Sequence, residues 1–176
     1  DPYTKGHSER VSNLSKKLAK FIGLSEAESI TIKKAATLHD IGKIGLKENI
    51  LHKKEPLFQE ELELIRRHPI IGEDICKPLH SLKQILPGIR YHHERWDGKG
   101  YPDRLKGEDI PIIARIINVI DSFDAIVSER PYRRSYSTNE AVNLMNTEKS
   151  SGQWDPWIVE KFITMIENDP LIHKGE

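Results

Sequence analysis

A chain of 176 residues and 20.3 kDa has the length of one domain and is long enough to enclose a hydrophobic core. Lys and Arg number 27, as do Asp and Glu, so the net charge is zero and bulk charge predicts neither a DNA or RNA polymer nor a membrane as partner. A single cysteine excludes an internal disulfide, which indicates a cytoplasmic location, and no apolar run approaches the roughly 18 residues of a membrane span.

Apolar residues repeat at helical spacing through most of the chain, without an alternating strand pattern of useful length. Two capping boxes, Ser25 with Glu28 and Ser137 with Glu140, mark helix starts, and Asp155 precedes a proline that suits a first turn. The predicted helices cover, in chain order, residues 6–22, 25–40, 59–67, 70–78, 82–94, 111–128, a segment beginning at 137, and 155–168. These features predict an all-α bundle.

A long loop is predicted at residues 95–110, between two of these helices. It is rich in glycine, and Gly98 and Gly100 permit backbone angles that other residues rarely adopt. Because loops of this length inside a compact domain are often functional, we expect this loop to contribute to a site.

Five histidines and two aspartates stand at the ends or in the middle of separate predicted helices. Imidazole and carboxylate together suit Mn, Fe or Zn, and the lack of a cysteine cluster argues against a structural zinc site. Neighbouring ligands in the chain can each serve a different ion of a pair held about 3.5–4 Å apart. These candidate ligands are His7, His39, Asp40, His68, His92, His93 and Asp121.

Asp121 has the strongest physical argument of the seven, because it interrupts a run of isoleucine and valine in its helix. A buried carboxylate costs several kcal/mol unless it is paired or binds a metal. A buried ion pair or a solvent-facing stripe would explain Asp121 equally well, and the residues alone leave this open. The remaining histidines, His52, His80 and His173, are expected at the surface.

Two motifs resemble those of a known family. The run HDIGK at residues 39–43 resembles the HD-x-G-K motif of the HD superfamily of metal-dependent phosphohydrolases. The run HHERWDGKGYP at residues 92–102 is similar to the HHE-x-x-DG-x-GYP signature of the HD-GYP subfamily. Further similarity at residues 7–11, 68–72, 110–116 and 130–133 extends the resemblance over the whole chain. It implies an HD-type bundle of about seven helices with a long GYP loop.

The resemblance also implies roles for the metal ligands. All seven candidates would hold a cluster of divalent ions, Fe or Mn, with Asp40 bridging two of them. Members with three metals carry a glutamate four residues before the first motif histidine, where this chain has Tyr3. We therefore expect two ions. Asp1 matches a family position beside the attacking water.

Other residues are expected to contact the substrate. Lys43 lies one turn beyond His39 if the helix continues that far, so its ammonium could neutralise charge on the phosphate or on the leaving oxygen. By resemblance, Arg130 and Arg133 grip a second phosphate and Tyr101 contacts the ligand. Trp96 offers a flat face to guanine, although a core position explains it equally well.

The predicted function is hydrolysis of cyclic di-GMP to linear pGpG, with GMP as an open further product. Three alternatives remain: another cyclic dinucleotide such as cyclic GMP-AMP, a non-catalytic module that binds nucleotide or a diguanylate cyclase, and an ordinary HD nucleotidase. The last is disfavoured by the GYP loop and the paired arginines. A diguanylate cyclase (GGDEF) protein and a second copy of the chain are the protein partners that the resemblance allows. Residues 1–176 begin without Met, so we expect one catalytic domain excised from a longer signalling protein, which a membrane tether could anchor.

Overall fold

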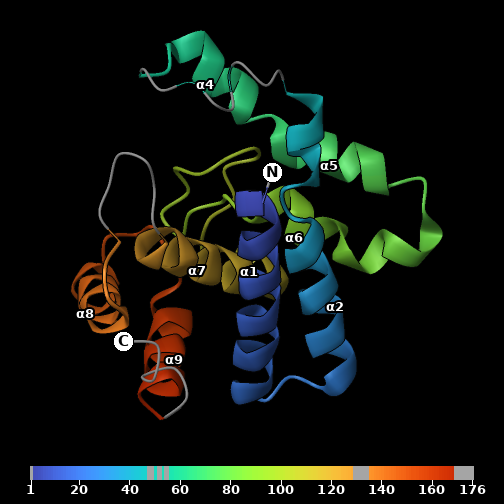
Figure 1. Cartoon of the computed structure of the whole chain (residues 1–176). Coiled ribbons are helices and arrows are strands. Elements are labelled where there is room, and N and C mark those ends of the chain that lie inside the picture. The colour runs from blue at the N-terminus through green and yellow to red at the C-terminus, as the bar shows by residue number, and fades with distance from the viewer. Residues whose placement is uncertain (1, 47–49, 51–52, 54–55, 129–134, 169–176) are drawn as a thin grey trace.

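The computed structural model describes residues 2–46, 50, 53, 56–128 and 135–168, with side chains from residue 6 onward (Figure 1). Within these ranges the regular elements are helices only, which confirms the all-α prediction. No described helix combines the length and the apolar character needed to cross a bilayer. The elements, in order, are α1 (Pro2–Phe21), α2 (Glu26–Leu38), the 3-10 helix η1 (Ile41–Gly45), α4 (Gln59–Ile65), α5 (His68–Cys76), the 3-10 helix η2 (His80–Ile85), α6 (Leu86–Tyr91), the 3-10 helix η3 (Gly107–Asp109), α7 (Ile112–Val127), α8 (Thr138–Glu148) and α9 (Pro156–Glu167).

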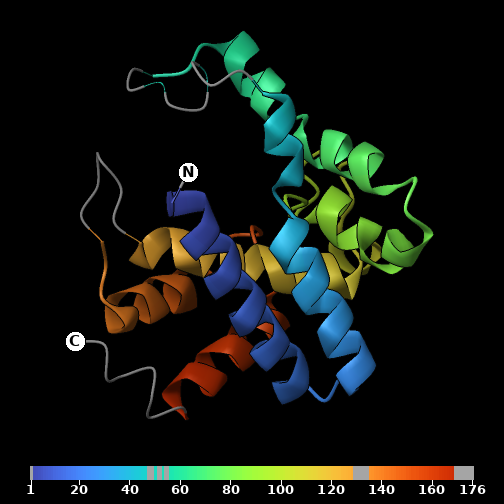
Figure 2. The same cartoon turned by 45° about the vertical axis from the view of Figure 1, so that its right-hand side comes forward.

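The core is built around α7, which packs against α1, α2, α6, α8 and α9. Most of its isoleucines are buried, and Ile116, Ile117 and Ile120 are fully so. Helices α1 and α2 lie side by side against it, and α8 and α9 cover its other end (Figures 1 and 2). Helix α4 has no buried residue and stands away from the bundle in both views.

The helix starts agree with the capping signals. Ser25 and Ser137 each accept the backbone N–H of the glutamate three residues on, and that glutamate accepts from the backbone of the serine. The carboxylate of Asp155 accepts from the N–H of Trp157 at 2.9 Å, which opens α9. Each pair satisfies amides that have no partner within the helix.

Two of the predicted helices, those that precede the motif histidines, differ from the helices in the structure. The helix expected at 82–94 is divided into η2 and α6, because Pro87 lacks an N–H and is accepted only in the first turn of α6. The helix expected at 25–40 ends at Leu38, and a 3-10 turn follows where irregular chain was expected. Both changes leave a motif histidine, His39 or His92, just beyond the end of a helix.

A glycine contact sets the distance between η1 and α5. A Cβ on Gly42 would overlap the carbonyl oxygen of His68 and lie 2.5 Å from the amide nitrogen of Gly72. Both obstacles are backbone atoms, so they cannot rotate away. The close approach places Asp40, at the start of η1, beside His68, at the start of α5.

Gly42→Ala is therefore expected to lower the free energy of unfolding by about 1–3 kcal/mol, the usual cost of forced overpacking. Urea unfolding followed by circular dichroism measures this loss. Gly45→Ala is the matched control in the same 3-10 turn, because its Cβ would meet only the side chain of Ile71, at 3.1 Å, which can shift. Equal stability of the two variants would contradict the close contact.

Candidate metal centre

Three histidines are fixed by the same local hydrogen bond. Each donates from Nδ1 to the carbonyl three residues earlier: His39 to Ala36 at 2.7 Å, His68 to Ile65 at 2.8 Å and His92 to Ile89 at 2.8 Å. These carbonyls belong to the last turns of α2, α4 and α6, where helix carbonyls lack partners. Since a carbonyl only accepts, Nδ1 carries the proton and the lone pair of each ring is on Nε2. All three rings are buried.

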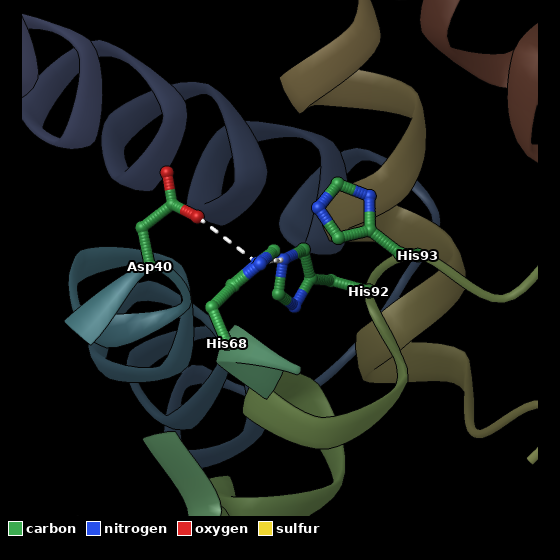
Figure 3. Close-up of side chains that lie close together, drawn as sticks. All are labelled: Asp40, His68, His92 and His93. Carbon is green, nitrogen blue, oxygen red and sulfur yellow. Dashed lines mark hydrogen bonds and ion pairs between the residues drawn. The ribbon is translucent and has the colours of Figure 1, made fainter. Parts of the chain in front are cut away.

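The structure brings all seven predicted ligands together in two adjoining groups. The first consists of Asp40, His68, His92 and His93 (Figure 3), and the second of His7, His39 and Asp121. In each group the ligand atoms lie within 4.8 Å of one another. They come from α1 and α7, from the residues that follow α2 and α6, and from the start of α5, so residues distant in sequence converge on one point.

Asp40 lies between the two groups, with its two oxygens facing different histidines. Its Oδ1 lies 3.3 Å from Nε2 of His68, and its Oδ2 lies 3.4 Å from Nε2 of His39 and 4.0 Å from Nε2 of His7. The side chain is only 8% exposed. A carboxylate so placed can offer one oxygen to each of two ions.

His7 is positioned by a residue that the sequence analysis missed. Its Nδ1 donates to Oδ2 of Asp124 at 2.7 Å, and its Nε2 lies 3.2 Å from Oδ1 of Asp121. The guanidinium of Arg10 donates to both oxygens of Asp124, at 2.6 and 2.9 Å. Asp124 follows Asp121 by three residues and Arg10 follows His7 by three, so helical spacing could have indicated both.

The protonation states are those a divalent cation requires. Burial lowers the pKa of His68 and His92 and brings that of His93 to about 3, so these rings are neutral at neutral pH. Burial alone would raise the pKa of Asp40, but the neighbouring His39 and Lys43 hold it well below its usual value. Asp121 is likewise ionised, its pKa lowered against burial by the hydrogen bond from His7. Metal ligands must be deprotonated in this way.

His7 differs from the other histidines before any cation binds. Burial lowers its pKa, but the carboxylates of Asp121 and Asp124 outweigh burial and raise the pKa to about 9. The imidazolium therefore neutralises part of the negative charge in the second group. A cation bound at Nε2 would take the place of this proton.

Polar atoms without partners show that the cluster fits a cation. Nε2 of His39 and Oδ1 of Asp40 are buried and accept no hydrogen bond within the described part of the chain. Nε2 of His68 lies 3.2 Å from Nε2 of His92, so two lone pairs face each other. Buried acceptors that face one another are costly unless a positive charge lies between them. The donor set, imidazole with carboxylate, suits divalent Fe, Mn or Zn.

The GYP loop folds back onto this cluster. A Cβ on Gly100 would overlap backbone atoms of Glu94 and Arg95, so only glycine allows the approach. Oε1 of the buried Glu94 accepts from the backbone N–H of Asp103 at 2.7 Å and ties down the far side of the loop. The ring of Tyr101 consequently stacks on His93, with centroids 4.9 Å apart.

The other residues expected to contact the substrate are only partly described. The helix that would place Lys43 one turn beyond His39 ends at Leu38, and Nζ of Lys43 lies 2.6 Å from Oδ2 of Asp40; its contact with the substrate stays a prediction. Trp96 is half-buried with the guanidinium of Arg115 above its ring, 5.7 Å from the centroid. Asp1, Arg130, Arg133 and the side chain of Tyr3 fall outside the described part of the structure, as do His52 and His173, whereas His80 is exposed as expected.

Comparison with known proteins identifies relatives over most of the chain. A family model described as "HD domain" matches residues 1–158. A cyclic di-GMP phosphodiesterase of Thermotoga maritima is 44% identical over 100% of this chain and 48% of its own length. A 3'3'-cGAMP-specific phosphodiesterase of Vibrio cholerae is 39% identical over 82% of this chain and 31% of its own length. The chain thus spans half or less of these relatives.

Solved structures share the fold at low sequence identity. Bd1817, an HD-GYP-type protein of Bdellovibrio bacteriovorus, superimposes with a TM-score of 0.73 at 20% identity, over 94% of this chain and 53% of its own. The HD domain of the Listeria monocytogenes phosphodiesterase PgpH in complex with cyclic di-AMP gives 0.68 at 20% identity, over 94% and 89%. Together with the motif residues gathered in the cluster, these matches confirm the resemblance found in the sequence: the chain belongs to the HD domain family, within its HD-GYP group.

Proposed function

We propose that this chain is the catalytic domain of a metal-dependent phosphodiesterase that opens cyclic di-GMP to linear pGpG. The observation that carries the proposal is the position of Asp40, whose two oxygens face two separate groups of imidazole and carboxylate ligands. A carboxylate in this position could hold two ions close enough to act together on one phosphodiester. The relative from Thermotoga maritima, named a cyclic di-GMP phosphodiesterase, supports the choice of substrate.

Two divalent ions, Fe or Mn, are proposed for the two ligand groups. One would be held by His68, His92 and His93, the other by His7, His39 and Asp121, with Asp40 shared. Such a pair lowers the pKa of a shared water and polarises phosphate oxygens. Tyr3 cannot supply the carboxylate that a third ion would need, which favours two.

The remaining residues are proposed to orient the substrate. Lys43 holds Oδ2 of Asp40 at 2.6 Å, and its side chain is 38% exposed, so its ammonium can also face a phosphate oxygen. Asp1 is proposed beside the attacking water. Arg130 and Arg133 are proposed to grip the second phosphate, and Tyr101, held by its stack on His93, to pack against the ligand.

Cyclic GMP-AMP is the second candidate substrate, because the relative from Vibrio cholerae named for that nucleotide is 39% identical to this chain. The two substrates share the sugar-phosphate ring and differ in one base. The metal ligands therefore do not separate these candidates. A diguanylate cyclase partner and a homodimer stay predictions from the sequence.

The proposal is tested by turnover of the protein purified without air and loaded with Mn²⁺ or Fe²⁺. We expect two metal equivalents per chain by elemental analysis and conversion of cyclic di-GMP to pGpG by chromatography. Asp40→Ala should abolish turnover, since it removes the shared carboxylate. Asp74→Asn, an exposed position on α5, is the control. A metal-loaded wild type that leaves cyclic di-GMP intact would defeat the proposal.

Asp124→Asn should lower the affinity for Mn²⁺ by about 10- to 100-fold, the usual effect of losing a carboxylate that orients a ligating histidine. The physical reason is the 2.7 Å hydrogen bond that fixes Nδ1 of His7 and leaves its Nε2 for the ion. Metal titration of the metal-free protein measures the affinity, and circular dichroism verifies the fold. An affinity equal to that of Asp74→Asn would remove Asp124 from the site.

The double variant Arg130→Ala with Arg133→Ala tests the second phosphate. Each charge-assisted contact is worth roughly 1.5–3 kcal/mol, so binding of cyclic di-GMP should weaken on the order of a hundredfold or more. Bis(p-nitrophenyl) phosphate has one phosphodiester and should be cleaved nearly as before. Parallel kinetics on both substrates decide, and equal losses on the two would refute the role of these arginines.

A further inference from the structure

A cavity of about 280 Å³ adjoins the metal centre on the side of the GYP loop. Its wall includes His93 and Asp121, one ligand from each metal group, and the ring of Tyr101. A volume near the lower end of the range for ligand pockets suits one planar base rather than a whole dinucleotide. Whatever enters it lies next to a phosphate held at the metal centre.

The cavity is formed where three segments meet. Helix α7 contributes Asn118 and Ala125, the GYP loop contributes Arg95, and the turn between α8 and α9 contributes Gln153. The last two segments are joined through their backbones, because the N–H of Trp96 donates to the carbonyl of Gln153 at 3.3 Å and that of Asp97 donates to Gly152 at 2.8 Å. Segments far apart in the sequence therefore form one wall.

Arg95 is held rigidly at this wall. Its Nε and Nη2 donate to the two carboxylate oxygens of Asp97, at 3.0 and 2.8 Å. Asp97 in turn accepts the N–H of Lys99 at 3.0 Å. This bidentate pair fixes the plane of the guanidinium and leaves Nη1 without a hydrogen bond to the described residues.

Asn118 fixes the wall of the cavity rather than offering a group to a ligand. Its Nδ2 donates to the carbonyls of His92 and Glu94, at 2.8 and 3.0 Å, and its Oδ1 is buried out of reach of the cavity. Gln153 is half-buried at the cavity wall, and its side-chain amide makes no hydrogen bond to the described residues. Nη1 of Arg95 and the amide of Gln153 are therefore polar groups that a ligand in this cavity can meet.

We propose that this cavity binds a guanine base of the substrate, beside the phosphate held at the metal centre, with Arg95 and Gln153 recognising its edge. The proposal rests on the proposed function only in placing that phosphate at the metals. Guanine presents the acceptors O6 and N7, which match the donors of an arginine, together with N1–H and N2–H₂ donors for amide oxygens. Adenine would set its N6 donor against the arginine, so guanine fits better.

The test compares ligands with and without a base on the Mn²⁺-loaded protein. Calorimetry measures the binding of GMP, AMP and ribose 5-phosphate, which share a phosphate and differ in the base. We expect GMP to bind at least about tenfold tighter than ribose 5-phosphate, and tighter than AMP. Gln153→Ala should weaken GMP roughly 3- to 10-fold, the range for one hydrogen bond, and leave ribose 5-phosphate unchanged. Ala125→Leu should fill the cavity with a larger side chain, so that GMP binds no more tightly than ribose 5-phosphate.

Gln84→Ala, an exposed glutamine on η2 outside the cavity wall, is the matched control and should change neither ligand. Equal affinities of GMP and ribose 5-phosphate for the wild type would overturn the base subsite. An equal loss of affinity for GMP and for ribose 5-phosphate in Gln153→Ala would also overturn the base subsite. Binding of AMP as tight as that of GMP would overturn the choice of guanine. Turnover of cyclic di-GMP is measured separately on the wild type. Its absence bears on the proposed activity, whereas the base comparison depends only on binding.

Discussion

The site depends on hydrogen bonds that three histidine rings make to carbonyls at the end of the helix that precedes each of them. His39, His68 and His92 each donate to a carbonyl three residues earlier. This one bond gives a partner to a carbonyl at a helix end and also fixes the tautomer of the ring. The bond needs the helix to stop at the histidine, and this explains why α2 ends at Leu38 and α6 at Tyr91. The point at which each helix ends and the position of its ligand are therefore linked. A further turn of α2 or α6 would carry the histidine ring away from the cluster.

The sequence predicts the seven ligands well, but it predicts poorly the residues that position those ligands. The seven ligand candidates could be named because histidines and aspartates recur at the ends or in the middle of separate predicted helices and because the motifs are specific. Asp124 escaped notice, since a carboxylate three residues after Asp121 could equally face solvent. Its role depends on which face of α7 meets α1, and only packing decides that. The ion pair of Lys43 with Asp40 was not foreseen for a related reason, because helical spacing does not show that α2 ends at Leu38 and that a 3-10 turn follows.

The GYP loop illustrates a second limit of prediction. Its glycines indicated unusual backbone, and Gly98 does adopt a φ of 79°. Gly100 is needed for another reason, the close approach of the loop to Glu94 and Arg95. A sequence pattern does not distinguish these two uses of glycine, because the partner of a close approach lies elsewhere in the fold. The consequence matters for the site, since this approach is what stacks Tyr101 on His93.

Metal chemistry and substrate choice reside in different parts of this site. The ligands face the phosphate, which cyclic di-GMP and cyclic GMP-AMP have in common, so their geometry is equally suited to either. Discrimination between two nucleotides that differ in one base must come from groups that meet that base, and unpaired polar groups penalise the wrong one most strongly. Arg95 and Gln153 are such groups; Arg95 is held by Asp97, and the backbone of Gln153 is held by Trp96, both outside the metal cluster. Substitutions there can alter the preferred base while Asp40 and the histidines keep the same arrangement.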